Sequence, residues 1–251
     1  TGGINLRDDH MGKKKRLSPW RDTHIRISGY GVVGLQNVFF NDWRYVTKDK
    51  SDAKNLVKQG YFLDNYNFGG DVGMQIVTSG PESDNQSIKQ AMIKLISSAK
   101  KSIYIQTPYF IPDETFYNAI VMAKNSGVDV NIMIPKKPDK KYVYFATLSF
   151  LKDLIKQGIN VYRYNGFIHS KTLVVDDLAT TIGTCNTDNR SFALNFEVNA
   201  IMYGKDFCQK NRRIFIRDIK DSTRLTSDYY KRKKFGSSIA QAICRLFSPL
   251  M

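Results

Sequence analysis

Residues 167–177 read FIHSKTLVVDD and place His169 two positions before Lys171, at the head of an apolar run. His169 is one of three histidines in the 251-residue chain. Side chains at positions i and i+2 point to the same side of a β-strand. The stretch therefore predicts a strand over residues 169–176 that presents an imidazole and an ammonium group side by side.

This pair of side chains suits phosphoryl transfer. A neutral imidazole is a competent nucleophile or proton carrier near neutral pH. A lysine ammonium beside it supplies positive charge for a phosphate oxygen. The chemistry needs neither a metal ion nor a cofactor, and the sequence predicts none. The three cysteines are widely spaced, so they predict neither a disulfide framework nor a zinc site.

Further polar residues follow the histidine and the lysine. Thr184 and Asn186 come after a glycine, and their hydroxyl and amide groups are expected to donate hydrogen bonds to phosphate oxygens. Glu197 begins a later predicted strand and is expected to accept the proton of the second imidazole nitrogen of His169, which would fix the tautomer of the ring. Asp176 is expected to tie down the end of its strand or to help set the lysine.

Apolar periodicity predicts strands that alternate with helices along most of the chain. The predicted strands cover residues 24–29, 102–107, 128–135, 159–164, 169–176, 180–186 and 197–203. The predicted helices cover residues 33–43, 84–99, 114–125, 144–157 and 206–218. Ser83 or Asp84 is expected to cap the second of these helices. This order predicts an α/β fold with a mixed sheet that helices cover on both faces.

The first part of the chain repeats the order of its last part. TGGIN (1–5) matches IGTCN (182–186), DTHIRISG (22–29) matches EVNAIMYG (197–204), and FFNDW (39–43) matches FIRDI (215–219). We interpret this as a duplication, in which residues 1–70 are the end of a first repeat plus a linker and residues 71–251 are a second repeat. The chain is then expected to be a fragment whose missing part carries its own copy of the histidine motif.

The formal net charge of +15 predicts attraction to a polyanion, either nucleic acid or an anionic lipid surface. No apolar run approaches the ~18 residues that a membrane-spanning helix needs. Basic runs at residues 13–16, 136–141 and 231–234 favour a membrane-facing surface. After the last run comes an apolar stripe that is expected to pack on the core, the slightly favoured outcome, or to lie in the lipid interface. The stripe consists of Phe235, Ile239, Ala242, Ile243, Leu246 and Phe247.

Four other residues have less distinctive settings. His10 lies in a polar turn and is expected to be solvated, and His24 is expected to be structural. Cys185 is expected to pack as a small core residue. Tyr109 lies in a loop after a predicted strand, where it either lines an entrance for acyl chains or caps the core.

The stretch HSKTLVVD followed by IGTCN resembles the H-x-K-x(4)-D signature of the phospholipase D superfamily. Within that superfamily the chain resembles bacterial cardiolipin synthases over essentially its whole length, in segments such as TPYFIPDE, GFIHSK, NTDNRSFALNFEVNA and LFSPLM. The resemblance implies a duplicated α-β-α sandwich with mixed sheets, here with its first repeat truncated. It also implies an active site between the two repeats, where one histidine forms a phosphohistidine and the other acts as general acid and then as base.

The activity implied by the resemblance is transfer of a phosphatidyl group from one phosphatidylglycerol to the hydroxyl of another, with release of glycerol. The residues that match the catalytic motif are His169, Lys171, Asp176, Asn186 and Glu197. The expected substrate-binding residues are Thr184, Tyr109, Asn5 as the counterpart of Asn186, and Asp22 as the counterpart of Glu197. The expected partners are phosphatidylglycerol, an anionic membrane surface and the missing half of the parent chain, whose N-terminal helices are expected to anchor it at the cytoplasmic face of the cell membrane.

Two other functions fit the same residues. A phosphodiesterase or nuclease of the superfamily would hold a nucleic-acid backbone on the basic surface and bring two His169 side chains together in a dimer. Nucleic acid is the less expected partner, and the sequence predicts no particular oligomeric state. An inactive half-site that binds anionic lipid is the third possibility, because the second histidine is absent.

Overall fold

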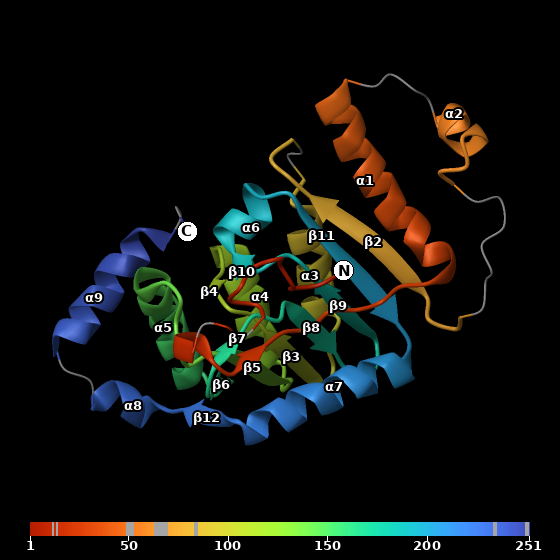
Figure 1. Ribbon diagram of the computed structural model, residues 1–251. Coiled ribbons are helices and arrows are strands. Elements are labelled where there is room, and N and C mark those ends of the chain that lie inside the picture. Colours follow the sequence, from red (N-terminus) through yellow and green to blue (C-terminus); the bar gives the residue numbers. More distant parts are fainter. Residues whose placement is uncertain are drawn as a thin grey trace.

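The computed structural model describes residues 1–11, 13, 15–48, 53–62, 70–82, 85–232, 235–248 and 251. At its centre is an eight-stranded mixed sheet with the strand order β12-β6-β5-β3-β8-β9-β11-β2 (Figure 1). In that order the strands are Ser222–Leu225, Asn160–Tyr164, Asp129–Pro135, Ser102–Gln106, Thr172–Val175, Ala179–Gly183, Glu197–Tyr203 and Met74–Ser79. Strands β6, β5 and β3 run parallel to one another, and all other neighbouring pairs in this sheet are antiparallel.

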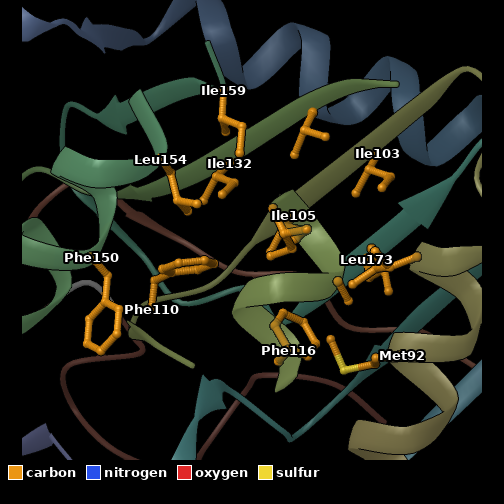
Figure 2. Close-up of a cluster of buried hydrophobic side chains, with 14 of the residues drawn as sticks. Met92, Ile103, Ile105, Phe110, Phe116, Ile132, Phe150, Leu154, Ile159 and Leu173 are labelled. Carbon is orange, nitrogen blue, oxygen red and sulfur yellow. The ribbon is translucent and has the colours of Figure 1, made fainter. Parts of the chain in front are cut away.

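Helices cover both faces of the sheet, as the sequence predicts. On one face lie α3 (Ser87–Ser97), α4 (Glu114–Asn125) and α5 (Lys141–Lys156), and α7 (Lys205–Lys220) crosses the other face (Figure 1). The largest apolar core lies between the first three helices and the sheet. Figure 2 shows part of this core, with side chains from α3, α4 and the central strands.

The central strands are apolar on both sides because both sides are covered. In β3, Ile103 and Ile105 belong to the large core. Tyr104 lies between them in the sequence and packs against Phe215 of α7, with ring centroids 5.1 Å apart. Side chains alternate between the two faces of a strand, which produces this division.

The helices predicted from periodicity are present, with shifted ends. The helix expected at residues 33–43 is longer and forms α1 (Val32–Thr47). Asp113 begins α4 by accepting a hydrogen bond from the backbone N–H of Phe116 at 2.8 Å. Ser83 and Asp84, the expected cap of α3, lie outside the described residues. Periodicity did not predict β2, β12, α2 (Ala53–Lys58) or α8 (Ser227–Lys231).

The strand expected over residues 169–176 is interrupted. The short strand β7 (Phe167–Ile168) pairs in parallel with β1 (Trp20–Arg21), and β8 begins only at Thr172. The backbone N–H of His169 still donates to the carbonyl of Arg21 at 2.7 Å. From Thr172 onward the chain pairs with β3 and β9 instead. His169, Ser170 and Lys171 therefore lie where the chain leaves the N-terminal segment and enters the main sheet.

Residues 24–29 do not form the expected strand. In the part of the chain that the structure describes, they make one isolated bridge, in which His24 pairs antiparallel with Gly2. The backbone N–H of Gly3 donates to the carbonyl of Thr23 at 3.1 Å beside this bridge. The segment thus has a single short partner instead of a sheet.

The same bridge occurs in the main sheet, at the positions that the internal repeat aligns with it. Gly183 of β9 pairs antiparallel with Asn199 of β11. The backbone N–H of Thr184 donates to the carbonyl of Val198 at 3.0 Å. The aligned segments 1–5 and 182–186 therefore make equivalent contacts with the aligned segments 22–29 and 197–204.

The C-terminal helix α9 (Phe235–Leu246) packs against α5 at one edge of the molecule (Figure 1). Gln241 is buried on the packed side, and Cys244 contacts the large core. The apolar stripe points the other way, since five of its members are exposed: Ile239, Ala242, Ile243, Leu246 and Phe247. The slightly favoured expectation of core packing is wrong for these five residues, because α9 presents its less apolar side to α5. The side chain of Phe235, and Lys14, Lys233 and Lys234 of the basic runs, lie outside the described residues.

None of the described helices combines the length and the apolar character needed to cross a membrane.

Candidate active site

A pocket of about 500 Å³ opens beside His169. Its walls come from the N-terminal segment, the link between β7 and β8, the end of β9 and the start of β11, and α1 and β2 complete the rim. The polar side chains that line it include Asn5, His169, Lys171, Thr184, Asn186 and Glu197. Segments far apart in the sequence thus bring most of the predicted site residues to one place.

The imidazole of His169 is held by a carboxylate from the N-terminal segment. Its Nδ1 lies 2.9 Å from Oδ2 of Asp22. An ionised carboxylate only accepts hydrogen bonds, so the proton lies on Nδ1 and Nε2 keeps its lone pair. Burial lowers the pKa of His169, although the hydrogen bond to Asp22 raises it. The ring is therefore neutral near neutral pH, as a nucleophile must be.

Asp22 is itself held firmly in place. Its Oδ1 accepts a hydrogen bond from the backbone N–H of Thr23 at 2.7 Å. Burial raises the pKa of Asp22, but the hydrogen bond from His169 and the charge of Lys171 outweigh burial and lower it overall. Gly3 makes room for this pair, because a Cβ atom there would lie 2.1 Å from Oδ1 of Asp22 and 2.7 Å from the carbonyl oxygen of His169.

Lys171 is a buried cation at the wall of the pocket, with 6% of its surface exposed. Its Nζ donates to the carbonyl oxygen of His169 at 2.6 Å. Burial lowers the pKa of Lys171 to about 8, against the opposing charges of Asp22 and Glu197. The ammonium is therefore charged near neutral pH and has further hydrogens to offer to a phosphate oxygen.

Glu197 does not have the partner that the sequence analysis predicts. One of its oxygens accepts a hydrogen bond from the hydroxyl of Thr184, and the other accepts one from Nδ2 of Asn195 at 3.2 Å. The expectation that Glu197 orients His169 is wrong, because Asp22 occupies Nδ1 of that ring. The hydroxyl of Thr184 lines the pocket but already donates to Glu197, so it is not free to donate to a phosphate as expected.

The two asparagines of the aligned segments, Asn5 and Asn186, both line the pocket. Nδ2 of Asn186 donates to the hydroxyl of Ser191 at 3.2 Å. Its Oδ1 is buried without a hydrogen-bond partner in the described part of the chain. The Ser191 hydroxyl and the Asn186 amide both also hydrogen-bond the buried carboxylate of Asp188, which keeps Nδ2 of Asn186 on the side of Ser191 and Asp188. Donation from Asn186 to an anion therefore stays a prediction.

His10 belongs to the site, although the sequence analysis predicts that it is solvated. Only 6% of its side chain is exposed, and its ring meets that of His169 edge-on with centroids 4.7 Å apart. The backbone N–H of Asn5 donates to Nδ1 of His10 at 3.1 Å. Burial and the neighbouring His169 lower the pKa of His10. The polar sequence around His10 gave no signal of this burial, which comes from the fold of the N-terminal segment over Trp20.

The structure places Asp176 away from the pocket. It follows β8, at the end opposite Lys171, and four strand residues separate the two by ~15 Å of extended chain. The carboxylate accepts hydrogen bonds from the backbone N–H groups of Lys100, Lys101 and Ser102 at 2.7, 3.0 and 2.6 Å. This geometry agrees with tying down the strand end and contradicts a direct catalytic role.

Tyr109 also lies outside the residues that line the pocket. Its hydroxyl donates to Oδ2 of Asp139 at 2.5 Å, and its ring packs against the large core. Burial raises its pKa. Of the two alternatives for Tyr109, the structure favours capping of the core, and the expected contact with substrate stays a prediction.

The other expected structural residues have ordinary settings. His24 takes part in the bridge to Gly2. Cys185 is buried, and burial raises the pKa of its thiol, so the sulfur is protonated and packs as expected.

Among the described residues, His10, Asp22 and His169 are grouped closely enough for a metal ion, with donor atoms within 4.8 Å of one another. These atoms already have other partners. Asp22 and His169 bond to each other, and His10 accepts from Asn5.

Comparison with known proteins identifies the family to which the chain belongs. Residues 92–219, just over half of the chain, match the family described as cardiolipin synthase, PLD-like domain. The chain belongs to this family. The matched range of this cardiolipin synthase domain contains His169, Lys171, Asn186 and Glu197, whereas Asp22, the acid that holds His169, lies before it.

Cardiolipin synthases of known sequence extend the similarity to the whole chain. Cardiolipin synthase 2 of Staphylococcus epidermidis is 46% identical over 252 residues, which cover 100% of this chain and 51% of the relative. The major cardiolipin synthase ClsA of Bacillus subtilis is also 46% identical over 252 residues, covering 100% and 52%. The chain therefore spans about half the length of these relatives.

Two solved structures share the fold of this cardiolipin synthase domain. Nuc from Salmonella typhimurium, a phospholipase D family member, has a TM-score of 0.54 at 22% identity and covers 62% of this chain and 100% of its own. Phosphatidylserine synthase from Haemophilus influenzae has a TM-score of 0.56 at 19% identity and covers 78% and 50%. At these identities the likeness concerns the fold alone, and it confirms the expected α/β fold of the phospholipase D type.

Proposed function

We propose that the chain carries one half of an active site that transfers a phosphatidyl group from one phosphatidylglycerol to another. The observation that carries the proposal is the contact between Asp22 and Nδ1 of His169, which leaves Nε2 as a nucleophile beside the ammonium of Lys171. The relatives named cardiolipin synthase support the choice of substrate. The products are cardiolipin and glycerol.

In the first step, Nε2 of His169 attacks the phosphorus, and the bond from phosphorus to the headgroup glycerol oxygen breaks. Glycerol leaves with a proton from a general acid, the role that the family resemblance gives to a second histidine. Lys171 and the amide of Asn186 hold the non-bridging oxygens as charge shifts onto them. Asp22 balances the positive charge that the phosphorylated ring acquires.

In the second step, the hydroxyl of another phosphatidylglycerol attacks the phosphorus and gives its proton to the same acid–base group. The bond between phosphorus and Nε2 breaks, which releases cardiolipin. His169 returns to its neutral form with the proton still on Nδ1, because Asp22 holds it there throughout. The group that donated a proton in the first step thus recovers one in the second.

Glu197 is proposed to orient the second imidazole in the way that Asp22 orients His169. The support is the internal repeat, in which Asp22 aligns with Glu197 and the adjoining bridges from Gly2 to His24 and from Gly183 to Asn199 are equivalent. Glu197 lines the same pocket, so an imidazole on the far side of a bound phosphate would lie within its reach. The division into residues 1–70 and 71–251 is part of this proposal.

The proposed substrate also indicates where in the cell the active site works. Phosphatidylglycerol is an anionic membrane lipid, and a chain with a net charge of +15 is attracted to its surface. We place the active site at the cytoplasmic face of the cell membrane, in a whole protein that N-terminal helices anchor.

Product analysis tests the proposed reaction. The whole protein is given radiolabelled phosphatidylglycerol in detergent micelles, and lipids and glycerol are separated. Cardiolipin with an equal amount of glycerol is the expected result, and it disappears in His169→Ala. Phosphatidic acid as the main product would indicate a hydrolase, and cleavage of DNA instead of lipid would indicate a nuclease, so either outcome would overturn the proposal.

A further inference from the structure

The helix α9 is apolar on the side that faces solvent. Ile239, Ala242, Ile243, Leu246 and Phe247 recur at the spacing of one helix face and are all exposed. We call these five residues the α9 outer face. The opposite side is fixed to α5, where Arg245 forms an ion pair with Asp153 at 2.6 Å. A surface helix normally turns its polar side outward, so this orientation calls for something that covers the apolar side.

The C-terminal end of the α9 outer face is connected to the active-site pocket through α6. The carbonyl of Met251 accepts a hydrogen bond from the backbone N–H of Arg190 at 3.0 Å, which holds the C-terminal end of the chain on α6 (Asn189–Ala193). The chain then passes from α6 to β11 through Leu194 and Phe196, which are 60% and 69% exposed. Phe196 also lines the pocket. Exposed apolar side chains therefore lie at the pocket, on the turn after α6 and along α9.

Cationic residues flank these apolar ones. Arg232 is exposed just before α9, beside Lys231, which pairs with Asp228 at 3.2 Å, and Arg190 is exposed on α6. The core of a protein–protein interface is depleted in lysine, whereas apolar side chains interspersed with lysine and arginine are typical of helices that lie in the headgroup region of an anionic bilayer. The charge of this edge is thus complementary to anionic lipid.

We propose that the α9 outer face, together with Leu194 and Phe196, docks on the surface of a bilayer that contains anionic phospholipid. Docking places the mouth of the pocket against the headgroups, where a phosphodiester enters without leaving the membrane. This inference rests on the proposed function for its choice of lipid, and it assigns the surface by which the domain meets its substrate.

Sedimentation with vesicles tests the docking surface. The chain is mixed with vesicles of phosphatidylcholine alone or with added phosphatidylglycerol, and the bound fraction is measured against lipid concentration. We expect binding to the phosphatidylglycerol vesicles that weakens with salt. The double substitution Ile243→Glu and Leu246→Glu is expected to weaken it by about tenfold or more, because two apolar side chains no longer enter the interface. Arg232→Ala is expected to weaken binding to the anionic vesicles alone.

The matched control is Met122→Glu, which places a carboxylate on an exposed apolar residue of α4, 67% exposed. It is expected to bind vesicles like the unchanged chain. The milder pair Ile243→Ser and Leu246→Ser guards against misfolding, and thermal unfolding of each variant is recorded. Vesicle binding that the α9 substitutions leave unchanged would overturn the proposal. The proposal would also be overturned if the α9 substitutions changed only the oligomeric mass of the protein, since the α9 outer face would then contact a second copy of the chain.

The proposed docking surface and the proposed reaction can be tested separately, because one is measured by vesicle binding and the other by phosphatidyl transfer. The binding assay does not require His169, so His169→Ala is expected to bind vesicles normally. If the α9 substitutions weaken vesicle binding but no cardiolipin forms, the docking surface stands and the proposed reaction falls.

Discussion

Asp22 and His169 are 147 positions apart in the sequence, and their side chains meet at 2.9 Å between Oδ2 and Nδ1. The acid comes from the N-terminal segment and the imidazole from the link between β7 and β8. Neither segment forms the site alone, because the pairing of β1 with β7 and the hydrogen bond from the N–H of His169 to the carbonyl of Arg21 set their relative positions. The protonation state of His169 therefore depends on residues outside the matched family range.

The first prediction concerns Asp22→Asn. An amide at this position can donate to Nδ1 and so favour the tautomer with the proton on Nε2, which removes the nucleophilic lone pair. We expect kcat of the whole protein to fall by about 10²- to 10⁴-fold, by analogy with acid–imidazole pairs in other enzymes. The control is Asp8→Asn on an exposed carboxylate, which should keep its rate. A rate within a few-fold of the unchanged enzyme would contradict the role given to Asp22.

A second prediction separates the two acids by the pKa of His169. The hydrogen bond and charge of Asp22 raise this pKa against burial, so Asp22→Asn should lower it further. Glu197→Gln should leave it nearly unchanged, because Glu197 bonds to Thr184 and Asn195 instead. NMR titration of the His169 ring measures both. A larger shift with Glu197→Gln than with Asp22→Asn would restore Glu197 as the orienting acid.

Lys171 gives a third prediction, for the pH dependence of the rate. Its pKa is lowered to about 8 by burial, so the ammonium is charged below that pH and loses its proton above it. Activity should therefore decline as the pH rises through about 8. Lys171→Arg keeps its charge at these pH values and should move the decline to higher pH, whatever its effect on the maximum rate. An unchanged alkaline limb in this variant would show that another group controls it.

The fourth prediction is that Asp176 acts on stability. Asp176→Ala removes the acceptor of three backbone N–H groups, so we expect a loss of about 1–3 kcal/mol in the free energy of unfolding. Asp176→Asn should cost less, because asparagine keeps one acceptor oxygen and tolerates the positive φ of 50°. Urea unfolding measures both. If Asp176→Ala unfolds at the same urea concentration but has lost turnover, a catalytic role is indicated after all.

A fifth prediction concerns His10. Burial and the neighbouring His169 lower its pKa, and the N–H of Asn5 occupies Nδ1. Nitrogen NMR should therefore report a ring that is neutral near neutral pH, protonated on Nε2, and that titrates below the ordinary histidine range. A ring that titrates in that range with both tautomers populated would mean that His10 is solvated, as its polar sequence neighbours suggest.

Much of the fold follows from local sequence because its signals are local. The apolar spacing of residues 88–99 predicts α3. Gly127, which has a φ of +88°, follows the C-terminal end of α4 and marks where that helix stops. The interruption at His169 is different, since FIHSKTLVV has strand character throughout. The break arises because β7 pairs with β1 and β8 pairs with β3, a change of partner that only the tertiary structure reveals.

The site was predictable in its residue types and less so in its pairings. The spacing of His169 and Lys171 predicts that both face one pocket, and the internal repeat singles out Asp22. Which acid serves which imidazole depends on contacts between segments far apart in the chain, so the sequence favoured the acid nearer in sequence, Glu197. The burial of His10 and the outward turn of α9 have the same origin, because burial is decided by neighbours that are distant in sequence.

Capture of the covalent intermediate tests the role of His169 most directly. The whole protein is mixed with phosphatidylglycerol labelled at phosphorus, quenched in alkali, in which phosphohistidine survives, and digested so that the labelled peptide can be sequenced. We expect acid-labile label on the peptide that contains His169, and none on that peptide in His169→Ala. Label at another residue in the unchanged protein, or full turnover by His169→Ala, would contradict the mechanism.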